Sequence, residues 1–400
     1  MTPSIPVTTS RLSEHLPLLD LLPDNDPIAW VRGGDGLVGW GVFATTTVSG
    51  PTRFADARHW WQEQLSKMQI NDSVHTTGTG PILFTSFSFS PEDSSVLVIP
   101  EVVVGLRNGK SWITWIGDSP QPLLPQIAPD FPANSITWRK EFDEDNQWKT
   151  RVSQAVSRIQ AGEVEKVVLA REINVSAQSV IDPRKVLHKL SLEYPSTWNF
   201  AISNLVGATP ELLMRLTHGM ITSRVLAGTI SKTGNDERDL ALAASLARSS
   251  KDLEEHEYAV RSVADAIAPF CKSTNVPESP FVLHLATDVT GALVETLNKV
   301  DSFSVLEKLH PSAAVCGTPT HKASALINEI EGLARGRYAG PVGWIDASGD
   351  GELGIALRCG QIQGNSIRLY AGCGIVAGSD PERELAESQA KFAPMRSALS

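Results

Sequence analysis

The sequence predicts a mixed α+β protein in which strands and helices do not alternate regularly. Three observations support this class. Short β-like runs are numerous, few of them alternate one by one with helices, and several are joined by tight turns, as at Ser348–Gly351 and His218–Gly219. Such turns build antiparallel hairpins, whereas a doubly wound sheet needs a crossover helix between successive parallel strands.

Length and charge restrict the classes of protein to consider. The 400 residues allow two or three domains or one large one, and 42% of them are hydrophobic, which suffices for a sizeable core. The formal net charge of −10 argues against nucleic acid as the main partner, because that partner requires clustered positive charge. A small anionic substrate remains compatible, since the local field of a site can oppose the net charge.

Cysteine usage and the N-terminus indicate a cytoplasmic protein. The cysteines form no C-x-x-C pair and no zinc-binding spacing, so we expect free buried thiols in a reducing compartment. The first residues lack the basic segment and apolar core of a signal peptide. No apolar run reaches the length needed to span a membrane, and we expect no membrane partner.

The first 140 residues carry mainly strand patterns. We predict one helix, Phe54 to Met68, and a proline-rich connection, Asp118 to Asn134. The predicted strands are Leu37 to Thr46, Pro81 to Phe89, Ser95 to Val104 and Ser111 to Ile116.

A lysine at the start of a predicted strand is the first candidate for chemistry. A helical stripe that includes Val152 and Ile159 ends at Gly162, and the strand Lys166 to Val175 follows. Lys166 stands among residues fit for burial. It either protects an edge strand or, if desolvated, has a lowered pKa and acts as a base, and the pattern alone favours neither.

Glu211 is the second candidate. A helix from Asp182 and a strand, Trp198 to Asn204, precede the segment Gly207 to Leu216, and Glu211 lies there among apolar neighbours at a strand entrance. A half-buried carboxyl group has a raised pKa and can serve as a general acid. The alternative is a carboxylate at the edge of a turn.

A helix is predicted at Asn235–Arg248, and acidic residues begin the next predicted helix. The second helix starts near Asp252 with the pattern D-x-x-E, which ends at Glu255. Acids in a first turn normally cap a helix and complement its dipole. The functional alternative makes Glu255 an oxygen ligand for a divalent cation, and oxygen-only ligation favours Mg²⁺.

The last predicted helix also allows both a structural and a metal-binding interpretation. Asp380 as N-cap and Pro381 at the first helical position predict its start, and Glu384, Glu387 and Lys391 then share one face. An ordinary surface ion pair is the commoner meaning of such a face taken alone. Two carboxylates and an amine next to a glycine-rich strand end can also hold a cation beside an anionic substrate.

The remaining C-terminal segments contain two further polar residues among apolar ones. His284 is a lone histidine in an apolar strand, for which composition favours a core position, and Arg358 lies in the strand Glu352 to Gln363, where a guanidinium needs an anion. We also predict the helices Asp301 to Leu309 and Thr320 to Ala334, the second capped by Thr320 and ended by Gly336, and the strands Gly340 to Asp346 and Ser366 to Val376.

Together these segments resemble the chorismate-utilising enzymes, which include isochorismate, salicylate, anthranilate and aminodeoxychorismate synthases. The resemblance runs from Val164 to Lys391, and several motifs in one order are more specific than any single motif. In chain order the motifs are EKVVLARE (Glu165–Glu172), GATPELL (Gly207–Leu213), LAGT (Leu226–Thr229), SSKDLEEHEYAV (Ser249–Val260), HPSAAVCGTP (His310–Pro319), RYAGPVGW (Arg337–Trp344), GDGELGIALR (Gly349–Arg358) and AGCGIVAGSDPERELAESQAK (Ala371–Lys391).

The resemblance implies a Mg²⁺-dependent addition and elimination on chorismate. Lys166 would activate the attacking water and Glu211 would protonate the departing hydroxyl group. The implied metal ligands are Glu255, Glu384 and Glu387. The implied substrate-binding residues are Gly228, Thr229, His284, Ala314, Val315, Tyr338, Leu357, Arg358, Gly372, Gly374 and Lys391.

Within the family, single positions favour isochorismate synthase. Common aminodeoxychorismate synthases carry a lysine where this chain has Ala227, and anthranilate and salicylate synthases usually carry threonine at the position of Ala314. Rival interpretations are a salicylate synthase, a catalytically silent scaffold subunit, and a nucleotide-binding protein. The last lacks the P-loop lysine and the dinucleotide-binding glycine spacing.

The resemblance also implies a fold and an assembly. The expected fold is a single large unit of two stacked, mainly antiparallel β-sheets flanked by helices. Residues 1–140 would form a β-rich portion that completes the fold, residues 141–400 would form the chorismate-binding catalytic region, and the protein would be a monomer.

Overall fold

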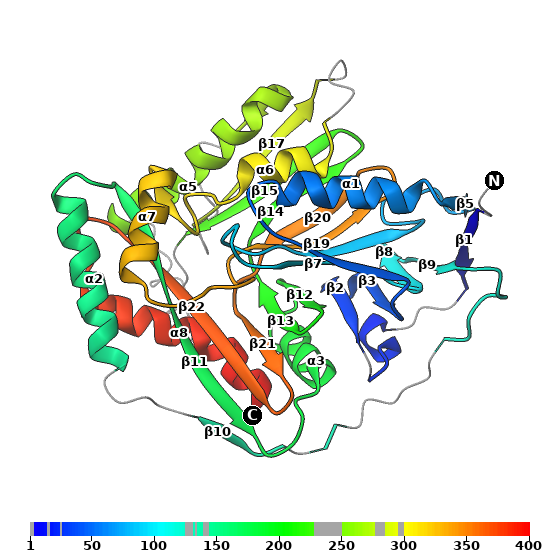
Figure 1. Cartoon of the computed structure of the whole chain (residues 1–400), viewed down its shortest axis with the longest axis horizontal. Coiled ribbons are helices and arrows are strands. Elements are labelled where there is room, and N and C mark those ends of the chain that lie inside the picture. The colour runs from blue at the N-terminus through cyan, green and yellow to red at the C-terminus, as the bar shows by residue number, and fades with distance from the viewer. Residues whose placement is uncertain are drawn as a thin grey trace.

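The computed structural model describes residues 4–13, 17–24, 26–124, 131–132, 134–138, 144–227, 250–276, 285–294 and 300–400. Its strands form two large sheets with helices on their outer faces, which confirms the predicted α+β class (Figure 1). The helix predicted at Asn235–Arg248 and three predicted site residues, Gly228, Thr229 and His284, lie outside the described residues.

The first sheet has 13 strands. Its pairs are antiparallel except for the parallel pair of β1 and β5, and β18 (Gly317–Thr318) pairs with the start of β11. The order along the sheet is β10 (Ile136–Trp138), β11 (Lys166–Ala177), β22 (Ser366–Ile375), β21 (Cys359–Gln363), β13 (Leu205–Thr209), β12 (Trp198–Ile202), β2 (Ile28–Arg32), β3 (Asp35–Trp40), β8 (Val102–Arg107), β9 (Lys110–Ile116), β1 (Ile5–Leu12) and β5 (Met68–Asp72).

The second sheet has 9 strands, and its pairs are antiparallel. Strands from the N-terminal part of the chain therefore lie in both sheets. The order is β16 (Cys271–Asn275), β17 (Leu285–Leu293), β15 (Met220–Ala227), β14 (Leu212–Thr217), β20 (Gly351–Ile355), β19 (Pro341–Asp346), β6 (Ile82–Ser86), β7 (Ser95–Ile99) and β4 (Ala44–Val48).

Three segments predicted as single strands, and the segment Gly207–Leu216 with Glu211 at its predicted strand entrance, each contain two strands that lie in different sheets. The pairs are β3 and β4, β7 and β8, β13 and β14, and β20 and β21. The break falls at Gly41, at Pro100, at Pro210 and at Arg358, and the first and last of these have φ angles of 68° and 48°. A left-handed backbone or a proline ends the ladder and redirects the chain. The prediction that Arg358 lies within a strand is therefore wrong.

The helices cover both sheets (Figure 1). Helices α1, α5 and α6 pack along the nine-stranded sheet, α3 and α8 pack on the thirteen-stranded sheet, and α2 and α7 lie beside β11. Their bounds are α1 (Arg53–Leu65), α2 (Glu144–Gln160), α3 (Pro183–Glu193), α5 (Ser250–Ile267), α6 (Ser302–Leu309), α7 (Thr320–Ile330) and α8 (Pro381–Leu399), with short 3₁₀ turns at Leu18–Leu21 and Ala268–Phe270.

Three helices start where the sequence predicts. Asp182, Asp301 and Asp380 each accept a hydrogen bond from a backbone N–H of the first turn of α3, α6 and α8, which confirms the N-cap predicted at Asp380. Helix α7 differs, since Pro319 precedes it without a side-chain cap and it ends at Ile330 rather than Ala334. The chain then turns at Gly332, whose φ of 66° no longer fits a helix.

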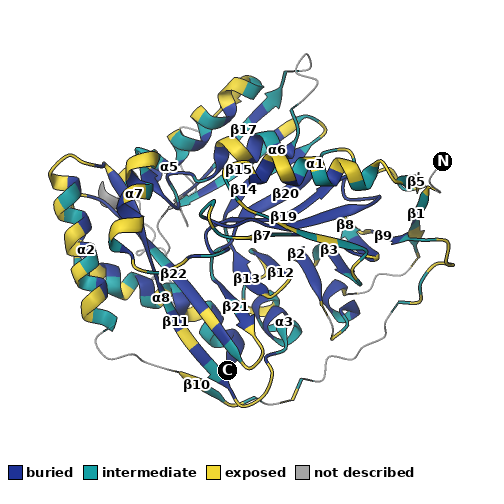
Figure 2. Ribbon diagram, in the orientation of Figure 1, coloured by how far each residue is buried: buried dark blue, intermediate teal, exposed yellow. Residues whose placement is uncertain are grey.

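Two hydrophobic cores hold these layers together, and the strands between them are largely buried (Figure 2). Alternate residues along one strand of the thirteen-stranded sheet pack in different cores. In β2, Ile28 and Trp30 face the core between the sheets, while Ala29 and Val31 face the core under α3 and α8. The strands of the thirteen-stranded sheet thus have apolar residues on both faces.

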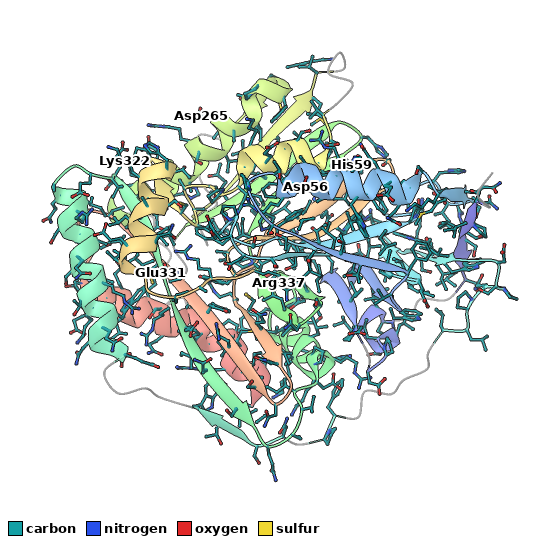
Figure 3. The ribbon with its side chains drawn as sticks, viewed as in Figure 1. Asp56, His59, Asp265, Lys322, Glu331 and Arg337 are labelled. Carbon is teal, nitrogen blue, oxygen red and sulfur yellow. The ribbon has the colours of Figure 1, made fainter. Side chains whose placement is uncertain are left out.

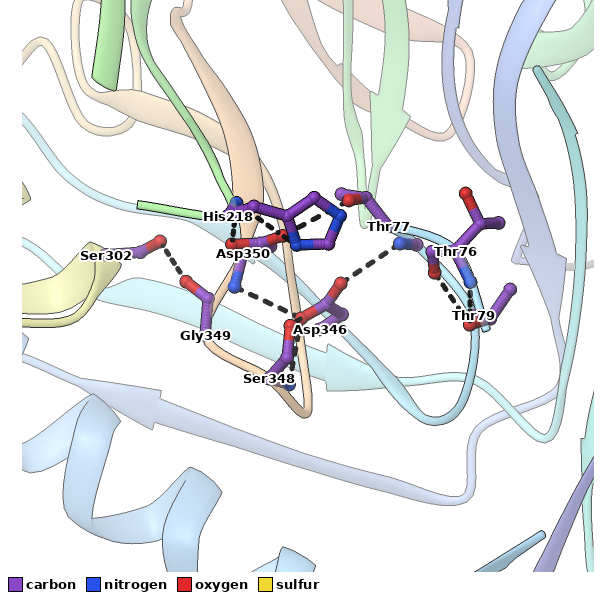
Figure 4. A network of polar contacts seen from close by, with 10 residues as sticks. Thr76, Thr77, Thr79, His218, Ser302, Asp346, Ser348, Gly349 and Asp350 are labelled. Carbon is purple, nitrogen blue, oxygen red and sulfur yellow. Dashed lines mark hydrogen bonds and ion pairs between the residues drawn. The ribbon is translucent and has the colours of Figure 1, made fainter. Parts of the chain in front are cut away.

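A buried polar network fixes the turn between β19 and β20 (Figure 4). Asp346 accepts hydrogen bonds from the backbone of Ser348, Asp350 and Gly78, and Asp350 accepts from the backbone N–H of His218. Burial raises the pKa of Asp346. These bonds tie β20 to the turn between β14 and β15, so they fix the two strands that lead to Glu211 and Arg358.

The cysteines and helices agree with two further expectations. The four cysteines are free thiols, of which Cys316, Cys359 and Cys373 are buried and Cys271 is half-buried. Among the helices of the described residues, none is long and apolar enough to cross a membrane.

Candidate active site

Most of the predicted site residues surround one cavity between the sheets. The cavity is lined by Val168, Pro210, Glu211, Leu226, Glu255, Ala314, Val315, Arg335, Tyr338, Ala339, Leu357, Arg358, Gly372, Gly374, Glu387 and Lys391. They come from β11, β15, β22, α5, α8 and four connecting segments, so folding brings together residues that are far apart in the sequence. Lys166 and Glu384 do not line the cavity, but each lies next to a residue that does.

Lys166 is buried at the end of β11. Its side chain is 1% exposed, and its ammonium group lies 3.4 Å from a carboxylate oxygen of Glu255 and 3.4 Å from the Glu255 carbonyl oxygen. Here β11 has β22 on one side and β18 on the other. Lys166 therefore does not protect an open sheet edge. Its side chain is buried, as the second of the two predicted alternatives requires.

Glu211 lies in the short link between β13 and β14. It is 6% exposed, its backbone N–H donates to the Thr209 hydroxyl group, and its carbonyl oxygen accepts from Ile355. Burial raises the pKa of Glu211 to about 7, although the positive charges of Lys166 and Arg358 oppose the rise. In a substantial fraction of the protein molecules this carboxyl group is therefore protonated at neutral pH, as a general acid requires.

Glycines on β22 make room for polar side chains of other elements. A Cβ atom at Gly374 would overlap the carboxylate of Glu255, and a Cβ atom at Gly372 would lie 2.8 Å from the Tyr338 hydroxyl group. Side chains at these two positions would push Glu255 and Tyr338 away. The glycine-rich segment thus lets a bare strand form one wall of the cavity.

Lys391 and Glu387 form a close pair at the cavity wall. The Lys391 ammonium group lies 2.6 Å from Glu387 Oε1 and donates to the carbonyl oxygen of Gly372 at 2.7 Å. Burial alone would lower the pKa of Lys391, but the Glu387 carboxylate outweighs this and raises it. The pair is therefore ionised, and it connects α8 to β22 rather than lying on the surface.

Arg358 supplies a half-buried positive charge to the cavity wall. Burial lowers its pKa, which Tyr338 and Glu387 only partly oppose. Because a desolvated guanidinium group favours a nearby anion, its place in the cavity wall favours binding of a substrate carboxylate at Arg358.

The acidic residues suit a hard divalent cation. Glu384 and Glu387 place carboxylate oxygens within 4.8 Å of one another and of Cys373 Sγ, and Glu387 and Glu255 line the same cavity. The thiol of Cys373 donates to the carbonyl oxygen of Glu384. The remaining donors are carboxylate oxygens, which is the donor set that Mg²⁺ prefers.

The structure adds residues that the sequence did not single out. Arg335 lines the cavity, and His256 is buried behind Lys166 and Glu255, with its Nε2 atom 2.8 Å from the Thr287 hydroxyl group. Burial, together with Lys166, lowers the pKa of His256 to about 4, so it is neutral. Arg335 stands in a glycine-rich stretch with no periodic pattern, and the sequence offers no signal that distinguishes it from a surface arginine.

Comparisons with known proteins show which sequences this chain is similar to. The family described as "Chorismate binding enzyme" matches residues 31–116 and 122–400. An isochorismate synthase of Bacillus subtilis, MenF, is 33% identical over 364 residues, which cover 82% of this chain and 76% of that protein. A second one from B. subtilis, DhbC, is 36% identical over 277 residues and covers 65% of this chain and 69% of its own length.

Solved structures match over nearly the whole chain. The crystal structure of a putative 2,3-dihydroxybenzoate-specific isochorismate synthase, DhbC from Bacillus anthracis, has a TM-score of 0.76 at 30% identity and covers 96% of this chain and 98% of its own. The menaquinone-specific isochorismate synthase MenF of Escherichia coli has a TM-score of 0.81 at 23% identity, with 100% and 95% coverage, and supports the fold.

Proposed function

Because this chain belongs to the family of chorismate-binding enzymes, we propose that it is an isochorismate synthase. The reaction adds a water oxygen at C2 of chorismate, shifts the two ring double bonds and releases the C4 hydroxyl group. One water enters and one leaves, so the product is an isomer of the substrate. Its product would feed menaquinone or siderophore biosynthesis.

One observation carries this proposal. A buried, partly protonated carboxyl group, Glu211, lines the cavity together with Arg358, and the buried Lys166 lies against Glu255 in the cavity wall. Hydroxide is a poor leaving group, so the reaction needs an acid at the departing oxygen and a base at the attacking water. Glu211 supplies the first and Lys166 the second.

The remaining residues bind and orient the substrate. Arg358, with Tyr338 beside it, would bind the enolpyruvyl carboxylate, and the bare backbone at Gly372 and Gly374 would let the ring approach β22. Glu255 and Glu387, with Glu384 assisting, would hold Mg²⁺ at the ring carboxylate. When bound, this ion would stabilise negative charge that develops as the ring carboxylate conjugates.

Lys166 must lose a proton before it can act as a base. Its ammonium group lies beside Glu255, and a cation at Glu255 would offset that negative charge.

We further propose a cytoplasmic monomer. The four free thiols support a reducing compartment.

Product analysis tests the proposal. Purified protein is mixed with chorismate and Mg²⁺, with an EDTA control, and the products are separated by liquid chromatography. Isochorismate that accumulates to an equilibrium mixture only with metal is the expected result. Salicylate with pyruvate would instead identify a salicylate synthase, and no consumption of chorismate would favour a catalytically silent subunit.

A further inference from the structure

Arg335 and Glu331 form a buried ion pair beside the cavity. The pair joins the end of α7, labelled at Glu331 in Figure 3, to the segment that follows it. Glu331 is 1% exposed and Arg335 is 4% exposed. Their side chains make two parallel hydrogen bonds, from Nε to Oε1 at 2.7 Å and from Nη2 to Oε2 at 2.6 Å, and the guanidinium group also lies 4.1 Å from the ring centre of Phe89.

The pair also holds the backbone of two other elements. Arg335 donates from Nη1 to the carbonyl oxygen of Val315 at 2.9 Å and from Nη2 to that of Val168 at 2.7 Å. Glu331 accepts from the backbone N–H of Ala170 at 2.8 Å. One ion pair therefore bridges α7, strand β11 and the loop 311–316.

Few other bonds hold this loop to the strand. The ladder between β11 and β18 pairs only Lys166 with Thr318 and Val167 with Gly317, and Val168 donates to Cys316 just beyond it. The guanidinium group makes the next connection along the strand. It therefore sets the distance between the loop and β11 at the level of Val168.

Both bridged backbones form the cavity wall. Val168, Ala314 and Val315 line the cavity, and Lys166 lies two residues before Val168, on the same side of the strand. A shift of the loop away from β11 would move the wall that faces the substrate relative to Lys166. Stability alone does not explain the pair well, because a buried ion pair is commonly no more stabilising than apolar residues of the same volume.

We infer that Arg335, held by Glu331, is a positioning residue of the substrate site that fixes the loop 311–316 against the lysine-bearing strand. Arg335 acts through Val168 and Val315 and does not take part in the proton transfers. The inference deepens the proposed function and rests on it for the identity of the substrate. The bridge between loop and strand itself does not depend on that identity.

The test substitutes Arg335→Lys, which keeps the charge but cannot bridge two carbonyl groups and a carboxylate at once. The matched control is Arg261→Lys, since Arg261 pairs with Glu257 at the same i, i+4 spacing but is 65% exposed. Hydrogen–deuterium exchange of peptides that cover 311–318 and 166–172 is measured first. We then measure kcat and KM for chorismate at a temperature well below unfolding of each variant.

We expect exchange in these two segments to be about tenfold faster in Arg335→Lys, which corresponds to the loss of a local opening free energy of about 1.4 kcal/mol. The KM for chorismate should rise about tenfold or more, with a smaller change in kcat, because a displaced wall weakens substrate contacts before it alters the acid and base. Arg261→Lys should match the unaltered protein in both measurements.

Each other outcome has a definite meaning. Unchanged exchange in Arg335→Lys would overturn the bridge, and faster exchange with unchanged KM and kcat would overturn the positioning role. If the unaltered protein does not convert chorismate, the proposed function fails, while the exchange experiment still decides the bridge. If Arg335→Lys does not fold, Glu331→Gln replaces it, with the same expectations at reduced size and the same refutations.

Discussion

Glu211→Gln should make the protein more stable and far less active. The substitution keeps the size of the side chain and removes the proton that we assign to the leaving hydroxyl group. Loss of a general acid typically lowers the rate by about 10²–10⁴-fold. Burial raises the Glu211 pKa from 4.5 to about 7, and this shift also affects stability.

The sign of the stability effect follows from the two pKa values. Between pH 4.5 and about 7 the unfolded chain has lost the Glu211 proton while the native state still holds it. The native state then binds more protons, so a rise in pH lowers the free energy of unfolding. Above pH 7, ionisation of the buried Glu211 lowers the free energy of unfolding by about 3 kcal/mol in all, at about 1.36 kcal/mol per pH unit. Glutamine does not ionise, so the variant does not lose this free energy.

The assay combines urea unfolding at pH 5 and pH 8 with turnover of chorismate. Relative to the unaltered protein, the glutamine variant should gain up to about 3 kcal/mol in the free energy of unfolding at pH 8 and much less at pH 5. Chorismate should still bind in the presence of Mg²⁺. Near-normal turnover would refute the assigned acid, and an equal stability difference at both pH values would refute the raised pKa.

Three further substitutions test other parts of the site. Lys166→Ala should abolish turnover but leave Mg²⁺-dependent binding of chorismate, measured by calorimetry, because the lysine is assigned to the water and not to the substrate. Gly374→Ala should raise the Mg²⁺ concentration needed for half-maximal activity about tenfold or more, since the new Cβ atom would displace the Glu255 carboxylate. Arg358→Lys should raise KM about tenfold or more, because an ammonium group cannot reproduce a two-pronged contact with a carboxylate.

Controls and contrary results separate these effects from misfolding. Each variant is compared with the unaltered protein by circular dichroism and thermal unfolding. Retained turnover in Lys166→Ala would exclude the lysine as the base. An unchanged Mg²⁺ requirement in Gly374→Ala would exclude Glu255 as a metal ligand, and an unchanged KM in Arg358→Lys would exclude this arginine as the carboxylate site.

Local features of the fold were predictable from local patterns. The helix starts at Asp182, Asp301 and Asp380 were predicted correctly because a helix start depends on side chains that contact only the first turn. The end of α7 was placed too late, although Gly332 marked it. A continued apolar pattern had suggested a longer helix than the backbone forms.

Sheet membership was not predictable in the same way. The segments that cross from one sheet to the other at Gly41, Pro100, Pro210 and Arg358 have strand character on both sides of the break. A β-strand pattern reports alternation of burial, and it does not report which strand lies alongside. The glycine and the two prolines were visible signals of a break, whereas the left-handed conformation of Arg358 was not.

The candidate site shows the same division. Patterns alone left Lys166 undecided between an edge strand and a buried base, and the motif resemblance selected the second. Burial between β18 and β22 now agrees with it. Arg335 was missed because its importance comes from Val168 and Val315, which are distant in the sequence and adjacent only in the fold.

The sequence by itself determined the α+β class, the helix starts, the family and the residue types that such chemistry needs. These depend on interactions within a few residues or on motifs that can be matched one by one. The tertiary structure alone decided which strands pair, which carboxyl group is desolvated and which arginines line the cavity. Those properties arise from burial and from contacts between distant segments, and no local pattern encodes them.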